Sequence, residues 1–434
     1  MFDSEALTKI QSIILIAIIV VAAVGGVAIY VLDGGGEQSS ETIKIGLLED
    51  LDGVIGRPNW QAAILAVEEI NAEGGILGRE VKLIGEDHDG GLDSLILTTA
   101  LTKLITTHKV DFIVGGGSGQ AEFLVQDAIA QHKIVYISGS QIPEEITQRV
   151  LDNYEKYKYY FNHAFNATSV MLGIADGVKH IRDLTGFNKI GYLAEDWARY
   201  TIERLDDFLP ENGFELVYKG KIPDGTVDFS SYFAQAEAAG VEVLFLMIAS
   251  DAGIPFVKEY YDRQSPMVVY GGLLGAAGVS KSWENTGGKC EYITTLVQPV
   301  TAGYPLTSET LPFRDSYIDR WGETPLFLGA AAYDIIRFIL FDAIKRAGTT
   351  ETEAVIGALE ETQVETSLAK NFVFTSNHDV LYSEGMISDR NGYGHPSILF
   401  QWQENATLVP IYPMWIMEEA GATYTFPDWP GPWD

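Results

Sequence analysis

The sequence predicts an α/β fold made of two lobes, each built on a doubly wound parallel sheet. Short apolar runs typical of buried strands alternate with amphipathic stretches of helical period, and glycine or proline separates many of them. Strands that alternate with helices at this spacing form a parallel sheet covered by helices. The alternation occurs twice, before Tyr154 and after Phe165, and 434 residues are too many for one ordinary domain.

The clearest βαβ unit lies at 110–140. In open α/β sheets, ligands bind beyond the carboxyl ends of the strands, where the N–H groups of a helix N-terminus point outward. We therefore expect the polar turns at 117–120 and 138–141 to line a small-molecule site. The sequence of the unit, VDFIVGGGSGQAEFLVQDAIAQHKIVYISGS, predicts a strand at 112–114, a glycine-rich turn at 115–119, a helix at 120–132 and a strand at 134–137.

The remaining elements follow the same reasoning. A helix between strands at 42–48 and 80–85 begins at Pro58 and ends at Gly74, because proline in the first turn and glycine after the last are usual helix ends. A helix at 92–107 precedes the βαβ unit, and a tyrosine-rich stretch at 154–165 interrupts the alternation. Later helices are predicted at 170–185, 200–211, 229–239, 255–263, 312–321, 329–347 and 351–362, and later strands or extended segments at 189–193, 214–220, 241–247, 267–270, 371–374 and 397–403.

The run from Ile13 to Leu32 contains no charged residue. At the rise of an α-helix it spans roughly 30 Å, the thickness of a bilayer core. A cleaved signal peptide would need a shorter apolar region and a small-residue cleavage site, and a core helix would need a polar face toward water. We therefore predict a membrane anchor at 1–32, a flexible linker at 33–41 and a single-pass protein of the cell membrane with an extracellular body. Anchor helices that pack together would also allow a homo-oligomer.

Charge and cysteine content narrow the classes of function. The formal net charge is −31, from 29 Lys and Arg against 60 Asp and Glu, and such a surface repels phosphate backbones, so we expect no nucleic-acid binding. Cys290 is the only cysteine, which excludes an intrachain disulfide. Asn166 and Asn405 each begin an Asn-x-Thr tripeptide, and both are candidate glycosylation acceptors in an extracellular body.

No motif in the sequence indicates catalysis, a cofactor or a metal. The turn at 115–119 lacks the Gly-Lys-Ser/Thr of a phosphate-binding loop, and Gln120 breaks the dinucleotide-binding and nucleophile-elbow patterns. This turn either contacts a ligand or only shapes the backbone. The acidic stretch at 86–89 resembles a calcium loop, but Leu92 stands where that loop needs glycine. Its alternative is a strand end whose carboxylates bond nearby backbone. We predict a binding protein and not an enzyme.

Seven short stretches extend this prediction through their order along the chain. They are NAEGGILG at 71–78, VKLIGED at 81–87, VDFIVG at 110–115, ISGS at 137–140, AYD at 332–334, QWQ at 401–403 and VPIYP at 409–413. In this order they resemble the branched-chain amino acid (Leu/Ile/Val-type) receptors of ABC importers, which are extracellular solute-binding proteins of the type I periplasmic-binding-protein fold. The similarity extends over about 43–413.

The resemblance implies two lobes that close on a small-molecule ligand like a hinge, and an ABC permease in the membrane as the partner. The three crossovers between the lobes fall near 161–167, 296–300 and 372–375. The implied organisation is lobe 1 at 42–162 and 298–372, lobe 2 at 163–297 and 373–420, and a proline- and tryptophan-rich tail at 421–434.

The same resemblance implies a set of ligand contacts at the strand ends and nearby helices. Trp60 fits a core as well as a site, and packing is the alternative for Tyr333. The family's acidic partner for a ligand ammonium would fall at 272–274, where the chain has no acid, so that role is left to Asp196 or Asp251. The candidate contacts are Ser118, Gly119, Gln120, Ser138, Ser140, Gln141, Asp196, Trp197, Ser250, Asp251, Trp60 and Tyr333.

The sequence thus predicts a membrane-tethered extracellular receptor that delivers a small solute to an ABC importer by closing its lobes. The solute would be amino-acid-like, an amide or a related molecule. The alternative from another class is an extracellular sensor, or a structural surface or filament protein, built on the same fold.

Overall fold

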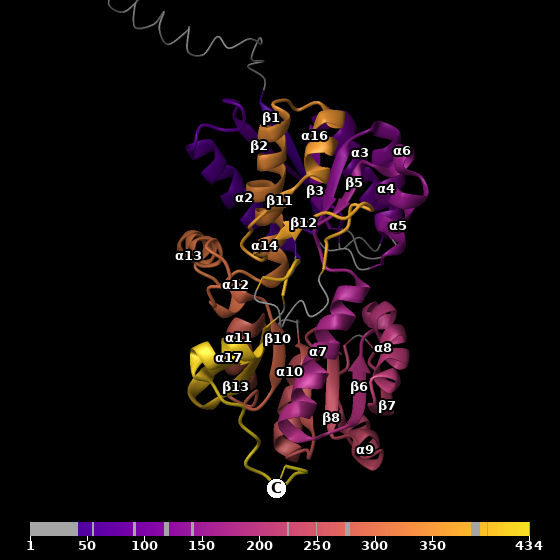
Figure 1. Ribbon diagram of the computed structural model, residues 1–434, viewed down its shortest axis with the longest axis vertical. Helices are drawn as coiled ribbons and strands as arrows, with labels where there is room; N and C mark the ends of the chain where they lie inside the picture. Colours follow the sequence, from indigo (N-terminus) through magenta and orange to yellow (C-terminus); the bar gives the residue numbers. More distant parts are fainter. Residues whose placement is uncertain are drawn as a thin grey trace, which may run out of the picture. The chain divides into compact units, whose positions relative to one another are not determined.

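Two β-sheets organise the part of the chain that the structure describes (Figure 1). The first sheet has the strand order β2-β1-β3-β4-β5, and the second has the order β14-β13-β10-β9-β8-β6-β7. We call the first sheet, with the elements packed on it, the first lobe. The second sheet, with its own packed elements, is the second lobe. The computed structural model describes residues 42–53, 56–89, 93–116, 121–139, 143–223, 225–248, 250–273, 278–382, 391–396 and 398–433.

The first sheet is parallel throughout, and its central strands β3 and β4 are buried on both faces. Every residue of β3 (Phe112–Gly115) and β4 (Val135–Ser138) is buried, and Ile113 lies opposite Tyr136 in their register. Strands buried in this way read as continuous apolar runs, because helices cover both faces of a parallel sheet. The other elements are β1 (Ile43–Glu49), α2 (Gly56–Ala72), β2 (Val81–Asp87), α3 (Ser94–Thr102), the π-helix η2 (Lys103–His108), α4 (Ala121–His132), α5 (Glu145–Asp152), α6 (Tyr154–Tyr157) and β5 (Tyr160–Asn162).

The side chains of β8 (Val243–Ile248) divide between two apolar cores of the second lobe. Leu244 and Leu246 pack in one cluster and Val243 and Phe245 in the other, because successive side chains of a strand point to opposite faces. The neighbouring elements are α7 (Ala167–Thr185), β6 (Lys189–Ala194), α8 (Arg199–Glu211), β7 (Glu215–Lys221), α9 (Ser230–Ala238), α10 (Gly253–Arg263), β9 (Val268–Leu273), α11 (Gly278–Thr286) and β10 (Thr294–Val297).

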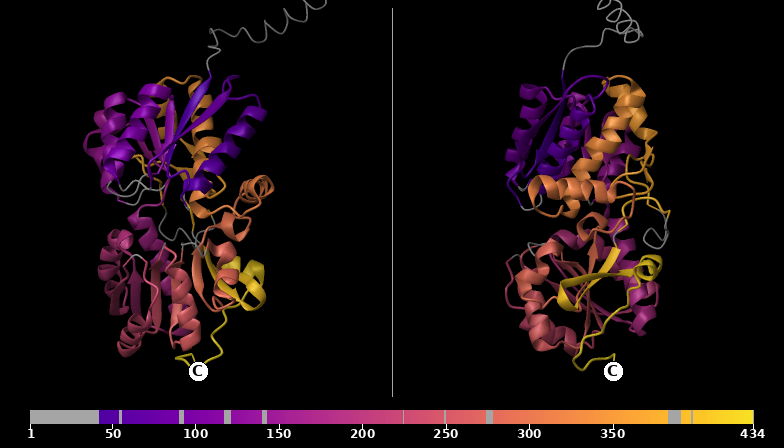
Figure 2. Two further views of the ribbon diagram at one scale, coloured as in Figure 1. Left: turned by 180° about the vertical axis from the view of Figure 1, so that it is seen from behind. Right: turned by 90° about the vertical axis from the view of Figure 1, so that its left-hand side faces the viewer.

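The second sheet is parallel from β10 through β9, β8 and β6 to β7, as predicted, and two antiparallel strands extend it at one edge. β10 pairs antiparallel with β13 (Ile398–Gln403), and β13 pairs antiparallel with β14 (Thr407–Tyr412). The short turn between β13 and β14 leaves no room for the crossover that parallel strands need. Figure 2 shows these yellow C-terminal strands at one edge of the second sheet, with α17 (Met414–Ala420) next to them.

Between β10 and β13 the chain returns to the first lobe. Tyr333, Ile336 and Leu359 join the apolar cluster around β1, β3 and β4. Phe374 and Val380 belong to the same cluster, so the chain still packs in the first lobe beyond the predicted crossover at 372–375. The returning elements are α12 (Pro299–Ala302), α13 (Thr310–Trp321), α14 (Phe327–Asp334), η4 (Ile335–Leu340), α15 (Phe341–Ala347), α16 (Thr352–Glu360), β11 (Gln363–Val364) and β12 (Phe372–Val373).

The tail after α17 contributes a large side chain to the second lobe. Trp429 is buried, its indole N–H donates to the carbonyl oxygen of Ser265 at 3.0 Å, and its ring meets Tyr260 and Tyr292 edge-on. The tail is therefore partly core, because an indole placed among aromatic rings with a partner for its N–H is stable away from water.

We find no helix with the length and apolar character of a membrane span among the described residues. The predicted anchor from Ile13 to Leu32 lies outside those residues, and it stays a prediction.

Candidate functional site

The carboxyl ends of β3 and β4 lie side by side at one edge of the first sheet. Gly115 and Ser138 are register partners, and the N–H of Gly139 donates to the carbonyl oxygen of Gly115 at 2.7 Å. The two turns that we expect to contact ligand therefore start next to each other. The candidate contacts Ser118, Gly119, Gln120, Ser140 and Gln141 lie outside the described residues and stay predictions.

Ser138 is described, and it faces the interior of the first lobe. Its hydroxyl donates to the carboxylate of Glu122 at 3.2 Å, and the hydroxyls of Tyr136 and Tyr160 approach the same carboxylate at 3.1 and 3.3 Å. All four side chains are fully buried. A buried carboxylate needs such donors, so the Ser138 hydroxyl has an internal partner, and its contact with a ligand stays a prediction.

A buried ion pair lies at the end of β1. Nε2 of His88 lies 3.7 Å from the Glu49 carboxylate and 2.9 Å from the carbonyl oxygen of Gly116, and the Asn59 amide donates to Glu49 at 2.9 Å. Burial would lower the pKa of His88, but the Glu49 carboxylate outweighs it and raises that pKa. The pair therefore holds the backbone where the chain leaves β3 for the first predicted ligand turn.

The second lobe has a matching buried carboxylate after β6. Glu195 accepts the N–H of Ser250 at 3.2 Å and also the Ser250 hydroxyl, so the ends of neighbouring strands β6 and β8 are tied together. Asp196 and Asp251 are exposed beside this contact. Only the backbone of Trp197 is described, in the short helix η3 (Asp196–Ala198). The structure thus brings Ser250 to Glu195, a residue that the candidate list lacked.

Trp60 and Tyr333 pack inside the first lobe. Trp60, on α2, is partly buried against the apolar core next to Gly85 of β2. Tyr333, on α14, is buried and packs against Phe313 with tilted rings whose centroids are 4.3 Å apart, and its hydroxyl donates to Glu69 of α2. These contacts fit the packing alternatives, and the ligand contacts of both residues stay predictions.

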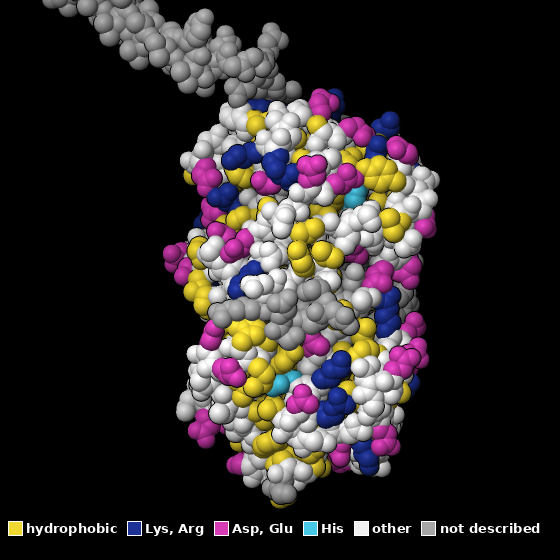
Figure 3. Space-filling view, in the orientation of Figure 1, with side chains coloured by type: hydrophobic (Ala, Val, Ile, Leu, Met, Phe, Trp, Pro, Cys, Tyr) yellow, Lys and Arg dark blue, Asp and Glu magenta, His cyan; other side chains and the backbone are white. Residues whose placement is uncertain are grey.

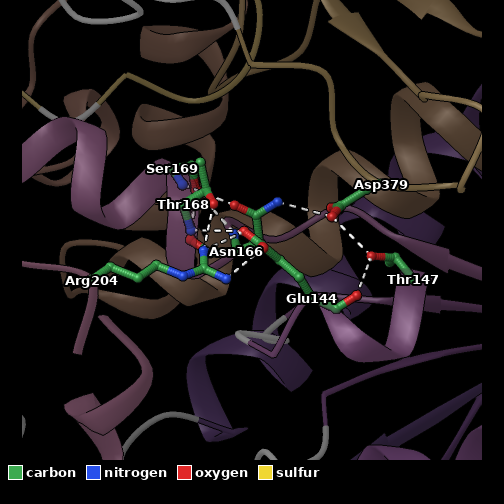
Figure 4. A network of polar contacts seen from close by, with 7 residues as sticks. All are labelled: Glu144, Thr147, Asn166, Thr168, Ser169, Arg204 and Asp379. Carbon is green, nitrogen blue, oxygen red and sulfur yellow. Dashed lines mark hydrogen bonds and ion pairs between the residues drawn. The ribbon is translucent and has the colours of Figure 1, made fainter. Parts of the chain in front are cut away.

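A charged contact joins the two lobes close to these strand ends (Figure 4). Arg204 of α8 donates to both carboxylate oxygens of Glu144, at 2.9 and 2.7 Å, and to the hydroxyl of Thr168. Glu144 also accepts the N–H of Thr168, in the first turn of α7, at 2.9 Å. Burial would raise the pKa of the Glu144 carboxyl, but these donors hold that pKa below its usual range. Glu144 precedes α5 of the first lobe, so the Glu144–Arg204 pair bridges the lobes.

A second, buried group lies beside this pair, and Figure 4 also draws its residues Thr147, Asn166 and Asp379. The carboxylate of Asp379 accepts the side-chain amides of Asn162 at 2.8 Å and Asn166 at 2.9 Å, and the hydroxyl of Thr147 at 3.1 Å. Asp379 is only 4% exposed, and burial raises the pKa of its carboxyl. We call these four residues the Asp379 cluster. It connects the end of β5, the start of α7 and the chain that follows β12.

Asn166 takes part in this cluster, and its role as a glycosylation acceptor stays a prediction. Its Oδ1 caps α7 by accepting the N–H of Ser169 at 2.9 Å, its Nδ2 donates to Asp379, and its exposed fraction is 9%. The amide nitrogen that would carry a glycan is therefore inside the fold. Asn405 lies exposed in the turn between β13 and β14 and stays a candidate acceptor.

Two histidines pack together near the Asp379 cluster. The rings of His163 and His395 have centroids 4.4 Å apart, and both stack on Phe372. Both are buried, and within the described part of the chain neither nitrogen of His163, nor Nε2 of His395, has a hydrogen-bond partner. Burial lowers the pKa of His163 well below its usual range and that of His395 to about 3. Both rings are therefore neutral at pH 7.

The described residues contain no group of three or more His, Cys, Asp or Glu side chains that could hold a metal ion. In the acidic stretch at 86–89, Asp87 accepts the N–H of Asp89 at 2.7 Å, and Glu86 pairs with Lys103 at 3.1 Å. These contacts agree with a strand end that bonds nearby backbone. On the face in Figure 3, acidic and basic side chains are interspersed.

Comparisons with known proteins place this geometry in a family. The periplasmic binding protein family matches residues 42–403. Leu/Ile/Val-binding protein homolog 7 of Brucella abortus is 23% identical over 402 residues, which cover 89% of this chain and 95% of that protein. The solved leucine binding protein of Thermotoga maritima has a TM-score of 0.66 at 18% identity, covering 86% of this chain and 98% of its own. A branched-chain amino acid transporter substrate binding protein of Streptococcus pneumoniae, solved with isoleucine, has a TM-score of 0.65 at 18% identity, covering 86% of this chain and 100% of its own.

The two helix-covered sheets and the extent of these matches define the class as an α/β binding protein of the type I periplasmic fold. The chain belongs to the family of periplasmic binding proteins. Within it, the fold is that of the branched-chain amino acid type of ABC transporter substrate-binding protein.

Proposed function

We propose that this protein is a membrane-tethered, extracellular receptor that binds a small solute between its lobes and delivers it to an ABC permease. It acts by binding and lobe closure, without chemical catalysis. A ligand that contacts both lobes stabilises the closed arrangement, since it binds that arrangement more tightly than the open one.

The observation that carries this proposal is the Glu144–Arg204 pair. Glu144 follows the turn after β4, and Arg204 lies on α8, which follows the turn after β6. A direct contact between these segments supports an arrangement in which the carboxyl edges of the two sheets approach each other. Ligands of open α/β sheets bind at this edge, so a solute there would touch both lobes.

We propose an amino-acid-like solute, an amide or a related molecule. One relative is a Leu/Ile/Val-binding protein homolog, and a structurally similar protein was solved with isoleucine. Both support an amino acid as the solute. The missing acid at 272–274 favours a ligand without a free ammonium, unless Asp196 or Asp251 faces it, because a buried ammonium without a negative partner is costly.

Calorimetric titration of a chain that starts at Thr42 tests the proposal. The ligands are L-isoleucine, L-leucine, L-valine, their amides and short-chain carboxylic acids. We expect one of these classes to bind and to reduce the radius of gyration in solution scattering. Binding without compaction would contradict the hinge, and no binding by any of them would contradict the proposed solute class.

The lobe boundaries, the anchor and the permease are parts of the same proposal. The apolar run from Ile13 to Leu32 supports tethering. Flotation of the full chain with lipid vesicles, compared with the chain from Thr42, measures it directly. We expect only the full chain to float, and equal behaviour of the two chains would remove the anchor from the proposal.

A further inference from the structure

The Glu144–Arg204 pair lies where a hinge motion would make or break it. The two residues belong to different lobes, since Ile146 of α5 packs in the first core and Leu205 of α8 packs in a core of the second. Both follow the carboxyl ends of strands, β4 for Glu144 and β6 for Arg204. Rotation of one lobe away from the other at this edge would separate the carboxylate from the guanidinium.

The pair is strong enough to hold the lobes and accessible enough to release them. Two charge-assisted hydrogen bonds in a bidentate arrangement are among the stronger polar contacts in proteins. The side chains of Arg204 and Glu144 remain 36% and 29% exposed. Water can therefore solvate both groups once they separate, and opening leaves no buried charge without a partner.

The Asp379 cluster, in contrast, stays formed when the Glu144–Arg204 pair opens. Asn162, Asn166 and Asp379 lie where the chain leaves the first lobe, after β5 and again after β12. The cluster is buried, so water cannot replace the donors to its carboxylate. The hydroxyl of Thr147 lies 3.1 Å from the Asp379 carboxylate and 3.0 Å from the carbonyl oxygen of Glu144. Thr147 therefore connects the Glu144–Arg204 pair to the buried Asp379 cluster.

We propose that the Glu144–Arg204 pair is a latch that stabilises the closed arrangement of the lobes, while the Asp379 cluster keeps the crossovers together in both arrangements. The latch rests on the proposed hinge function, because only a protein whose lobes separate can open it. It acts without touching the solute, through the equilibrium between open and closed forms.

Inter-lobe distances measured by pulsed electron paramagnetic resonance test the latch without any solute. Spin labels are attached at Leu151→Cys in the first lobe and Val227→Cys in the second, two positions that are 50% and 76% exposed. The native Cys290 is buried, and burial raises the pKa of its thiol to about 11, which protects it from labelling.

Arg204→Gln removes the guanidinium and leaves the Glu144 bond to Thr168 in place. We expect the ratio of open to closed molecules to rise about tenfold, as the loss of two charge-assisted bonds predicts. The matched control is Arg149→Gln, which removes an ion pair of similar length, 2.8 Å to Asp127, within the first lobe. The control should keep the wild-type distance distribution.

The charge-swapped double variant, Glu144→Lys with Arg204→Glu, distinguishes loss of the ion pair from a general loss of folding. It should restore part of the closed population that either single change removes, a coupling that a general loss of folding would not produce. Arg204→Gln with a wild-type distance distribution, or a charge swap no better than its single changes, would overturn the latch. Addition of L-isoleucine is a separate arm: absence of any shift there counts against the proposed ligand and not against the latch.

Discussion

Two polar contacts join segments of the two lobes, and they differ mainly in their access to water. Asp379 is 4% exposed and accepts three side-chain donors, whereas Glu144 and Arg204 form a bidentate ion pair about one third exposed. Loss of a partner in the first contact leaves buried polar groups without bonds, while loss in the second leaves groups that water can solvate. The difference separates a contact that maintains the fold from one that can open and close during function.

The largest expected effect follows from Asp379→Ala. This change removes an acceptor from three buried side chains. Asn162 and Thr147 keep the carbonyl oxygens of Ala164 and Glu144, whereas the amide nitrogen of Asn166 loses its Asp379 partner. The free energy of unfolding should therefore fall by about 2 to 3 kcal/mol. Denaturant unfolding measures it. Asp127→Ala is the control, because its carboxylate is 43% exposed, and it should cost less than about 1 kcal/mol. Equal losses would remove the distinction between buried and accessible contacts.

The buried histidines near the Asp379 cluster should make the fold sensitive to acid. The pKa of His395 is about 3 in the fold and about 6.5 in the unfolded chain, so below pH 6.5 the unfolded state binds more protons. Stability should therefore fall as the pH drops from 6.5 toward 3, by about 2 kcal/mol at pH 5 from His395.

Comparison with His395→Phe isolates this contribution, since phenylalanine can keep the stacking on Phe372. Unfolding at pH 7 and pH 5 should show a smaller loss of stability in the variant than in the wild type. The Glu144–Arg204 pair should instead persist at pH 5, because the pKa of Glu144 is held below its usual range. Equal pH dependence of the variant and the wild type would contradict the first expectation.

Ser138→Ala gives an intermediate case, a buried hydrogen bond within one lobe. Glu122 keeps the hydroxyls of Tyr136 and Tyr160, so the free energy of unfolding should fall by about 1 kcal/mol. Because the Ser138 hydroxyl faces Glu122, solute affinity should not change in calorimetry. A large loss of affinity with little loss of stability would restore Ser138 as a ligand contact.

The smallest effect on stability should come from Arg204→Gln. A tenfold shift of the lobe equilibrium corresponds to a loss of about 1.4 kcal/mol in the closed form alone. The open form does not contain the pair and keeps the rest of the structure, so the free energy of unfolding of the whole native population should fall by less than about 1 kcal/mol. Denaturant unfolding beside the distance measurements gives both values. A loss of stability as large as that of Asp379→Ala would make the pair part of the permanent structure.

Local patterns in the sequence predict most of the strands and helices, because apolar runs and helical periods depend on neighbouring residues. They place β1, β3 and β4 within a residue or two of their observed ends. The direction of β13 was not predictable in this way, since pairing with β10 depends on a partner distant in the sequence. The fate of Ser138 likewise depends on Glu122, a residue of the neighbouring helix.

Local patterns could not predict the polar contacts between the lobes, because each contact joins residues that are distant in the sequence. Glu144 and Arg204 are 60 positions apart and Asn166 and Asp379 are 213 apart. Taken alone, each of these four residues fits an ordinary solvated side chain or a turn residue. The Asn-x-Thr tripeptide at Asn166 predicts a glycosylation acceptor, but the same side chain also suits the N-cap position that it occupies in the structure.

The place of β13, β14 and Trp429 has a consequence for how the chain folds during synthesis. The five strands of the first sheet are complete once Asn162 has left the ribosome, but the second sheet lacks two strands until Tyr412 emerges. The aromatic surface around Tyr260 and Tyr292 stays uncovered for longer, until Trp429 emerges. Until then the second lobe presents an open strand edge and an uncovered apolar face, the features that chaperones protect from aggregation.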